Sequence, residues 1–179
     1  MGIPFEGRGA RFRASFEYLR QVTEGGAGKE NIYGSPRAGV ELLPRPTGGR
    51  LPLLVTGSSR QDPAWSAQHA DGWMTYPRDS GAQARVIAGW RDRVAAVGQP
   101  AKPVMQALYL DLVKDAEASP RGIHLGLSVG SRHLRAYLRA LEDMGVNHVA
   151  LNLRFNESNV ETALQRLADD VIPDFPGKG

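Results

Sequence analysis

The sequence predicts an α/β fold in which parallel strands alternate with helices. Four consecutive strand–helix units follow an initial helix, with few hairpin turns between them, which is typical of a parallel sheet. The third strand, Val104–Val113, is almost entirely apolar, as expected of a strand buried on both faces. Four strands make either an open sheet or half of an eight-stranded (β/α) barrel. In both cases ligands bind beyond the carboxyl ends of the strands.

Composition indicates one soluble globular domain over residues 1–179. Hydrophobic residues make up 41% and charged residues 23%, close to the averages for globular proteins. The chain has no cysteine, which excludes disulfides, thiolate catalysis and cysteine-ligated clusters. Its net charge of +3 is spread along the chain without a basic run, so we expect no nucleic-acid binding. The start of the chain lacks an apolar signal core and no apolar run could span a membrane, so we expect a cytoplasmic protein.

The first helix is predicted over Arg8–Thr23, where one face collects apolar side chains at spacings of three and four: Phe12, Phe16, Leu19 and Val22. Residues 24–50 are rich in glycine and proline and are predicted to form a loop-rich excursion. We expect a short strand within it, around Val40–Leu43.

The next two units follow directly. Leu51–Thr56 is predicted to be a strand, and a helix follows over Asp62–Ala70, where Asp62 is the expected N-cap and Pro63 the first helical residue. A second strand is predicted over Trp73–Tyr76. The helix after it, Ser80–Val97, carries its apolar residues on one face, namely Val86, Trp90, Val94 and Val97.

The last two units complete the pattern. After Val104–Val113 a longer connection, residues 114–130, leads to a helix over Ser131–Met144 with Leu134, Leu138 and Leu141 inward, and Gly145 is placed to cap its carboxyl end. Val146–Leu153 is the fourth strand. A capping box from Ser158 to Glu161 opens the final helix, which carries Val160, Leu164, Leu167 and Val171 and is stopped by Pro173.

The turn after the first strand, Thr56-Gly57-Ser58-Ser59-Arg60, is a candidate anion site. A helix amino terminus offers free N–H groups and partial positive charge, and a phosphate would suit glycine, two hydroxyls and an arginine. The alternative is that Ser58 or Ser59 only caps the following helix.

A second motif, Gly126-Leu127-Ser128-Val129-Gly130, matches the G-x-S-x-G nucleophile elbow of serine hydrolases. It would make Ser128 a nucleophile with His148 as its base. His148, however, lies within an apolar strand, and the only carboxylates between the two residues lie on the preceding helix. A serine hydrolase is therefore the weaker hypothesis.

The sequence gives little support for a metal site or a glycine-rich nucleotide loop. The four histidines form no metal-binding spacing, so no metal site is expected, and the usual glycine-rich nucleotide loops are absent. Trp73 and Tyr76 could flank a flat ligand, or serve only as core and rim aromatics.

Three stretches resemble the flavin-dependent luciferase-like monooxygenases. They are "LLVTGSSRQDPAWSAQHADGWMTYPR", "ALEDMGVNHVALNLRF" with "ALQRLADDVIPDFP", and "GIPFEGRGARFRASFEYLRQVTEG". The resemblance spans almost the whole chain in order. It implies a TIM-type (β/α)₈ barrel that binds reduced FMN and uses oxygen or a related oxidant on a small organic substrate. It also implies that Ser58 and Ser59 hold the flavin phosphate beside Gly57, that Arg60 is a charge partner, and that Trp73 and Tyr76 lie nearby.

The same resemblance implies that the chain is the C-terminal half of such a barrel, with about the last four β/α units. Two copies could then pair as a homodimer to close eight strands. A flavin reductase is an expected partner, and the deazaflavin F420 is an alternative cofactor because some relatives use it. The rival function is a flavin-binding or fragmentary protein without turnover. The resemblance identifies no catalytic base.

Overall fold

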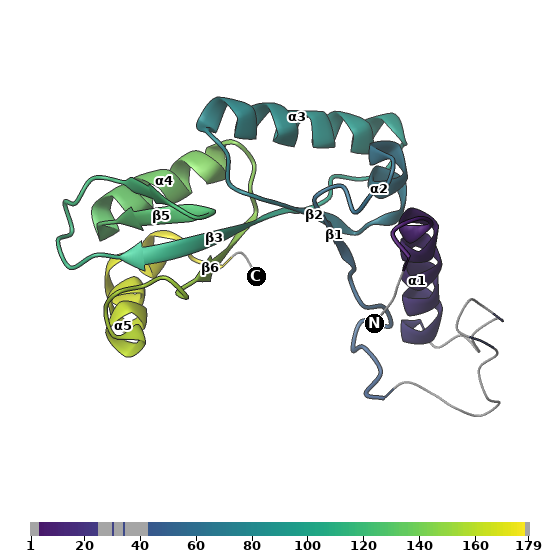
Figure 1. Ribbon diagram of the computed structural model, residues 1–179, viewed down its shortest axis with the longest axis horizontal. Helices are drawn as coiled ribbons and strands as arrows, with labels where there is room; N and C mark the ends of the chain where they lie inside the picture. The colour runs from purple at the N-terminus through teal and green to yellow at the C-terminus, as the bar shows by residue number, and fades with distance from the viewer. Residues whose placement is uncertain (1–3, 25–29, 31–33, 35–42, 178–179) are drawn as a thin grey trace.

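The computed structural model describes residues 4–24, 30, 34 and 43–177. Over these residues it confirms the predicted alternation of strands and helices (Figure 1). The elements are α1 (Arg8–Thr23), β1 (Leu54–Thr56), α2 (Pro63–His69), β2 (Gly72–Thr75), α3 (Ser80–Ala96), β3 (Val104–Leu112), β4 (Arg121–Ile123), β5 (Gly126–Val129), α4 (Ser131–Asp143), β6 (His148–Asn152), α5 (Val160–Asp170) and a 3₁₀ turn at Ile172–Asp174.

Four parallel strands form the body of the sheet in the order β1-β2-β3-β6. Their register sets Thr56, Met74, Met105 and His148 in one row across all four strands. This is the predicted arrangement, because successive strands joined through helices lie side by side and parallel.

The connection after β3 differs from the prediction. Residues 114–130 contain a hairpin, in which β4 runs antiparallel to β5 while β5 pairs in parallel with the far end of β3, from Tyr109 to Leu112. Leu125 makes the tight reversal with a φ of 48°. The sequence obscured this hairpin because its strands are only 3 and 4 residues long.

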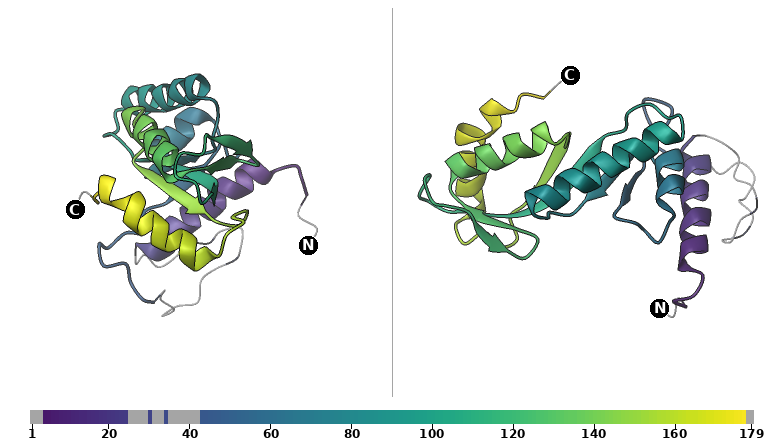
Figure 2. Two further views of the ribbon diagram at one scale, coloured as in Figure 1. Left: turned by 90° about the vertical axis from the view of Figure 1, so that its left-hand side faces the viewer. Right: turned by 90° about the horizontal axis from the view of Figure 1, so that it is seen from above.

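The helices cover one face of the sheet and follow one another around an arc (Figures 1 and 2). Residues of β3 alternate between buried and half-buried along its first six positions, because one face meets the helices and the other does not. Two apolar clusters fill the covered side: one joins β3 to α3 and α4, and the other joins β3 and β5 to α4 and α5. A third packs α1 on β1 through Phe16 and Val55.

Most predicted helix faces are confirmed, but three residues predicted to be buried on α1 and α5 are exposed. Leu134 and Leu141 are buried on α4, and Gly145 ends this helix with a φ of 95°. On α1, however, Leu19 is exposed.

On α5, Leu167 and Val171 are buried, but Val160 and Leu164 are exposed and Ala163 takes the inward position. The cap of α5 is Asn159 rather than Ser158, since its side chain accepts hydrogen bonds from Glu161 and Thr162.

The predicted strand at Val40–Leu43 lies mostly outside the described residues. Leu43 itself lies in a bend and is 72% exposed.

Candidate functional site

The turn after β1 has an uncommon backbone. Gly57, Ser59 and Arg60 all have positive φ, at 58°, 43° and 56°, a region that costs ordinary residues about 1–2 kcal/mol each. The Gly57 N–H donates to the Met74 carbonyl (2.9 Å) and the Gln61 N–H donates to the Ser58 carbonyl (2.8 Å). Such strain persists where surrounding contacts hold it, and it is concentrated at functional sites.

The two serines of this turn do not cap α2. Asp62 does so, as expected, because its carboxylate accepts from the Ala64 N–H at 2.7 Å. The Ser59 hydroxyl donates back to the Thr56 carbonyl (2.9 Å). The Ser58 side chain is exposed, and among the described residues its hydroxyl has no hydrogen-bond partner. The capping alternative is therefore wrong, and Ser58 is available to an external acceptor.

The first turn of α1 packs against the turn after β1. Gln61, which is 6% exposed, donates to the Gly9 carbonyl (3.0 Å) and accepts from the Arg13 guanidinium (2.6 Å). A Cβ on Gly9 would lie 3.2 Å from the Arg60 carbonyl, so glycine permits this close approach. The two segments are 48 to 52 positions apart in the chain, so no local sequence pattern links them.

Positive charge gathers where the two segments meet. The Arg60 guanidinium lies 3.8 Å from the centroid of the Phe5 ring, and that of Arg8 lies 4.8 Å from the same ring. The first turn of α1 contains no acidic residue, and its N-cap, Gly7, makes no side-chain capping bond. We call Ser58, Arg60 and Arg8, together with the first turn of α1, the basic corner. Its donors and charge fit a phosphate group.

The two predicted aromatic residues occupy different positions. Tyr76 is 42% exposed, and its ring lies 3.8 Å from the place of a Cβ on Gly57, beside the turn. Trp73 instead stacks on Trp90 of α3 on the covered face, with ring centroids 5.6 Å apart, and its indole N–H donates to the Gly57 carbonyl at 2.8 Å. Trp73 thus supports the turn from behind, while Tyr76 lies at its open side.

A second aromatic group was not predicted. Tyr109 of β3, His124 of the hairpin and Phe155 after β6 lie with ring centroids 4.9–6.3 Å apart. Phe155 is 41% exposed. The cluster depends on the β4–β5 hairpin, which brings His124 back over β3, so it could not be found without recognising that hairpin.

The nucleophile-elbow hypothesis is wrong in its geometry. Ser128 lies within β5 rather than at a strand-to-helix turn, is 4% exposed, and donates its hydroxyl proton to Asp111 at 2.7 Å. It pairs with Asp111 on β3, whereas His148 pairs with Met105. These β3 positions are six residues apart, or about 20 Å along a strand, so His148 cannot act as the base for Ser128.

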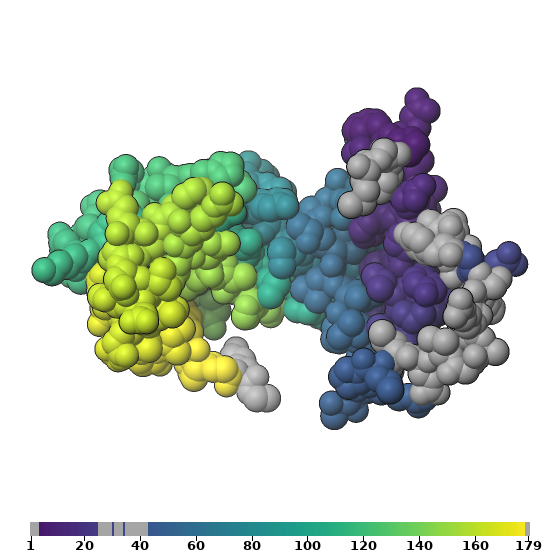
Figure 3. Space-filling model, turned by 60° about the horizontal axis from the view of Figure 1, so that its bottom comes forward, coloured from purple at the N-terminus to yellow at the C-terminus, as the bar shows by residue number. Residues whose placement is uncertain are grey.

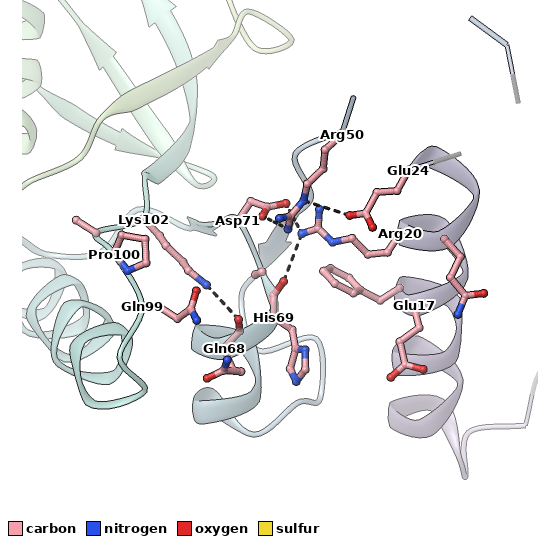
Figure 4. Close-up of a pocket in the computed structure, with 14 residues that line it drawn as sticks. Glu17, Arg20, Glu24, Arg50, Gln68, His69, Asp71, Gln99, Pro100 and Lys102 are labelled. Carbon is pink, nitrogen blue, oxygen red and sulfur yellow. Dashed lines mark hydrogen bonds and ion pairs between the residues drawn. The ribbon is translucent and has the colours of Figure 1, made fainter. Parts of the chain in front are cut away.

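A cleft of about 650 Å³ lies at the opposite end of the sheet, next to the amino ends of β1, β2 and β3 (Figure 4). Asp71 is its centre: it binds Arg20, Arg50 and the Leu53 N–H. Lys102 donates to the Ala67 carbonyl at 2.7 Å. Burial lowers the pKa of the Lys102 ammonium, against a smaller opposing effect of Asp71.

Each of the three cations in this cleft therefore has a protein partner. Their bonds tie α1, the end of α2 and the start of β3 together. We assign a structural role to the cleft, as is usual for the amino-terminal face of a β/α barrel.

Within the described ranges, no cluster of three or more acidic or histidine side chains could hold a metal ion. In the same part of the chain, no helix is long and apolar enough to cross a membrane.

Comparison with known proteins gives one family match. The sequence model described as luciferase-like monooxygenase matches residues 1–121. No curated protein sequence matches significantly.

Solved structures share the fold at low identity. The coenzyme F420 dependent tetrahydromethanopterin reductase from Methanopyrus kandleri matches with a TM-score of 0.73 and 14% identity, over 94% of this chain and 64% of its own. Monooxygenase RslO1 from Streptomyces bottropensis gives 0.72 and 14%, over 97% and 64%. DmoA from Hyphomicrobium sulfonivorans gives 0.60 and 10%, over 97% and 56%.

These matches confirm the predicted partial barrel of the TIM type. This chain spans less than two thirds of the length of each of these three proteins.

Proposed function

Because the chain belongs to the luciferase-like monooxygenase family, we propose that it is a flavin-dependent oxidoreductase that binds FMN and acts on a small organic substrate. The observation that carries the proposal is the basic corner at the carboxyl end of β1. Ligands of β/α barrels bind at this end, and the corner is exposed and rich in donors.

In this proposal the flavin phosphate lies against the turn from Gly57 to Arg60. Ser58 donates a hydrogen bond from its hydroxyl, and Arg60 supplies a charge-assisted bond. Arg8 and the free N–H groups at the start of α1 add positive potential. Ser59 acts differently, because its hydroxyl is engaged with Thr56 and so holds the turn in shape.

Tyr76 and Trp73 complete the proposed cofactor region. Tyr76 presents an exposed ring beside Gly57, where a flat ring system can pack against it. Trp73 fixes the Gly57 carbonyl through its indole N–H. A bound flavin supplies the redox chemistry, and the chain positions and shelters it. A flavin reductase that delivers reduced cofactor is part of the proposal.

The deazaflavin F420 is the alternative cofactor. Two proteins of similar fold, the tetrahydromethanopterin reductase and a secondary alcohol dehydrogenase, are F420-dependent. Both FMN and F420 contain a phosphate that the basic corner could hold. Parallel titrations with FMN and F420 distinguish them, since only the preferred cofactor should saturate at micromolar concentration.

The proposal is tested by titrating the chain with FMN and following flavin fluorescence. A Ser58→Ala, Ser59→Ala double variant should bind at least about tenfold more weakly, which corresponds to about 1.4 kcal/mol. The matched control is Ser119→Ala, an exposed serine in the loop after β3. Equal affinity in the wild type and the double variant would place the phosphate elsewhere.

A second candidate is a flavin-binding protein without turnover. It is supported by the same basic corner, which accounts for cofactor binding but for which no catalytic base has been identified. Substrate-dependent oxidation of reduced flavin separates the two functions, because a pure binder retains FMN but shows no such oxidation.

A further inference from the structure

Phe5 lies in the segment before α1 and is 60% exposed. The first described residues lie at the surface of the molecule, in dark purple in Figure 3. Phe5 belongs to none of the three apolar clusters of the described chain. Its ring instead contacts two cations, with the Arg60 guanidinium 3.8 Å and the Arg8 guanidinium 4.8 Å from the ring centroid. Both distances are within the roughly 6 Å of a cation–π interaction. Core packing therefore does not explain an aromatic residue at this position.

The backbone holds the ring and the arginines together from both sides. Gly7 has a φ of 74° and leads the segment that carries Phe5 into α1. The Arg60 carbonyl lies 3.2 Å from the place of a Cβ on Gly9. The Gln61 amide donates to the Gly9 carbonyl and to the Ser59 carbonyl, both at 3.0 Å. The contact between the Phe5 ring and Arg60 is thus supported by the close approach of the two segments.

The Arg60 side chain is exposed. Among the described residues its guanidinium forms no ion pair or hydrogen bond, and the Phe5 ring is its contact. An exposed arginine samples many rotamers, and a ligand that orders it must overcome that loss of conformational entropy. Stacking on a ring restricts the guanidinium before the ligand binds. The stack therefore prepares Arg60 for an anion.

Arg8 brings a second positive charge to the same ring. Like charges repel each other, so a pair of guanidiniums at one ring is best stabilised by an anion that both can reach. A phosphate monoester carries about two negative charges at pH 7, which matches the two cations. Phe5 thus gathers the charge that such a group needs.

We propose that Phe5 is a positioning residue, whose ring holds the Arg60 and Arg8 guanidiniums in place for a terminal phosphate group. It acts through the two arginines. The inference rests on the proposed function, because the flavin phosphate is the ligand assigned to the basic corner. It adds a residue outside the turn after β1 that determines how strongly the phosphate is bound.

The first measurement needs no flavin. In NMR spectra of the wild type, the Arg60 side-chain protons should show an upfield ring-current shift, with the signal identified by its absence from Arg60→Gln. Phe5→Leu should abolish this shift, and Phe5→Trp should retain it, because tryptophan is the strongest aromatic partner of a cation. An Arg60 signal without the shift in the wild type would overturn the inference and leave the proposed function standing.

The second measurement compares FMN with riboflavin, which lacks the phosphate, in fluorescence titrations. The ratio of the two affinities should fall about three- to fivefold in Phe5→Leu and return in Phe5→Trp. The matched control is Phe155→Leu, which removes a ring that is 41% exposed and lies 5.7 Å from the Arg154 guanidinium. The control should keep the wild-type ratio. A wild-type ratio in Phe5→Leu would overturn the inference.

A double-mutant cycle separates positioning from a general structural role. In the Arg60→Gln background, Phe5→Leu should lower the ratio by less than about twofold, because the main group through which Phe5 acts is gone. An equal loss in both backgrounds would overturn the inference. A wild type that shows the ring-current shift but binds FMN and riboflavin equally would instead refute the phosphate site itself, and the inference would fall with it.

Discussion

Gly57→Ala tests whether the backbone of the turn after β1 creates the cofactor site. Gly57 has a φ of 58°, where an alanine costs about 1–2 kcal/mol. The added Cβ itself would lie 3.8 Å from the Tyr76 ring, which is ordinary contact. The loss in the free energy of unfolding should therefore come from backbone strain alone.

The expected shift in Tm is a decrease of about 2–8 °C, since a chain of this size loses about 2–4 °C per kcal/mol. The control is Gly98→Ala, at the end of α3, which has a φ of 68° and open space around the added Cβ. Both variants should lose similar stability in urea unfolding.

Only Gly57→Ala should weaken FMN binding, because relief of its strain moves the carbonyl held by Trp73 and the donors of the turn. If Gly57→Ala bound FMN as tightly as Gly98→Ala, the backbone of this turn would not form the site. If it lost no stability, the argument from strain would be wrong.

Three further predictions concern the β5 end of the sheet and α4. Ser128→Ala should destabilise the chain by about 1–3 kcal/mol in urea unfolding, because buried Asp111 loses one of its two donors and keeps only the Glu157 N–H. Any background esterase activity should stay unchanged in this variant, whereas it would be lost if Ser128 were a nucleophile. Gly126→Ala should lower the free energy of unfolding by about 3 kcal/mol or prevent folding, because the added Cβ would lie 1.9 Å from the Tyr109 carbonyl oxygen. A Tm within about 2 °C of the wild type, which corresponds to about 1 kcal/mol or less, would contradict the β3–β5 pairing. Burial raises the pKa of the Tyr137 hydroxyl above its ordinary value of 10.0. The unfolded state therefore ionises first, and the free energy of unfolding should fall as pH rises above 10. Tyr137→Phe should flatten this fall when unfolding is measured against pH, and an unchanged slope would show that Tyr137 does not cause it.

The strand–helix alternation could be predicted from the sequence because each unit has its own local signals. Pro63 after Asp62 marked the start of α2, and Gly145 marked the end of α4, where a positive φ favours glycine. The errors arose where tertiary packing decided the outcome. Leu164 fits the apolar period of α5, yet it is exposed, and Ala163, one turn before Leu167, occupies the buried position.

The candidate site was only partly predictable for a similar reason. Its first half is continuous in sequence, so Gly57 to Arg60 stood out as one motif. Its second half comes from α1, and no local pattern linked Arg8 to Arg60. The available signal was the presence of arginine, rather than the usual acidic residues, in the first turn of a helix.

The most direct test of the phosphate site compares FMN with riboflavin, which lacks the phosphate, in fluorescence titrations of the wild type, Arg60→Gln and Arg85→Gln. Arg85 is exposed on α3 and serves as the matched control. The account predicts that the wild type and Arg85→Gln prefer FMN by about tenfold or more, and that Arg60→Gln loses most of this preference while riboflavin binding stays constant. An unchanged preference in Arg60→Gln would contradict the assignment of the flavin phosphate to the basic corner.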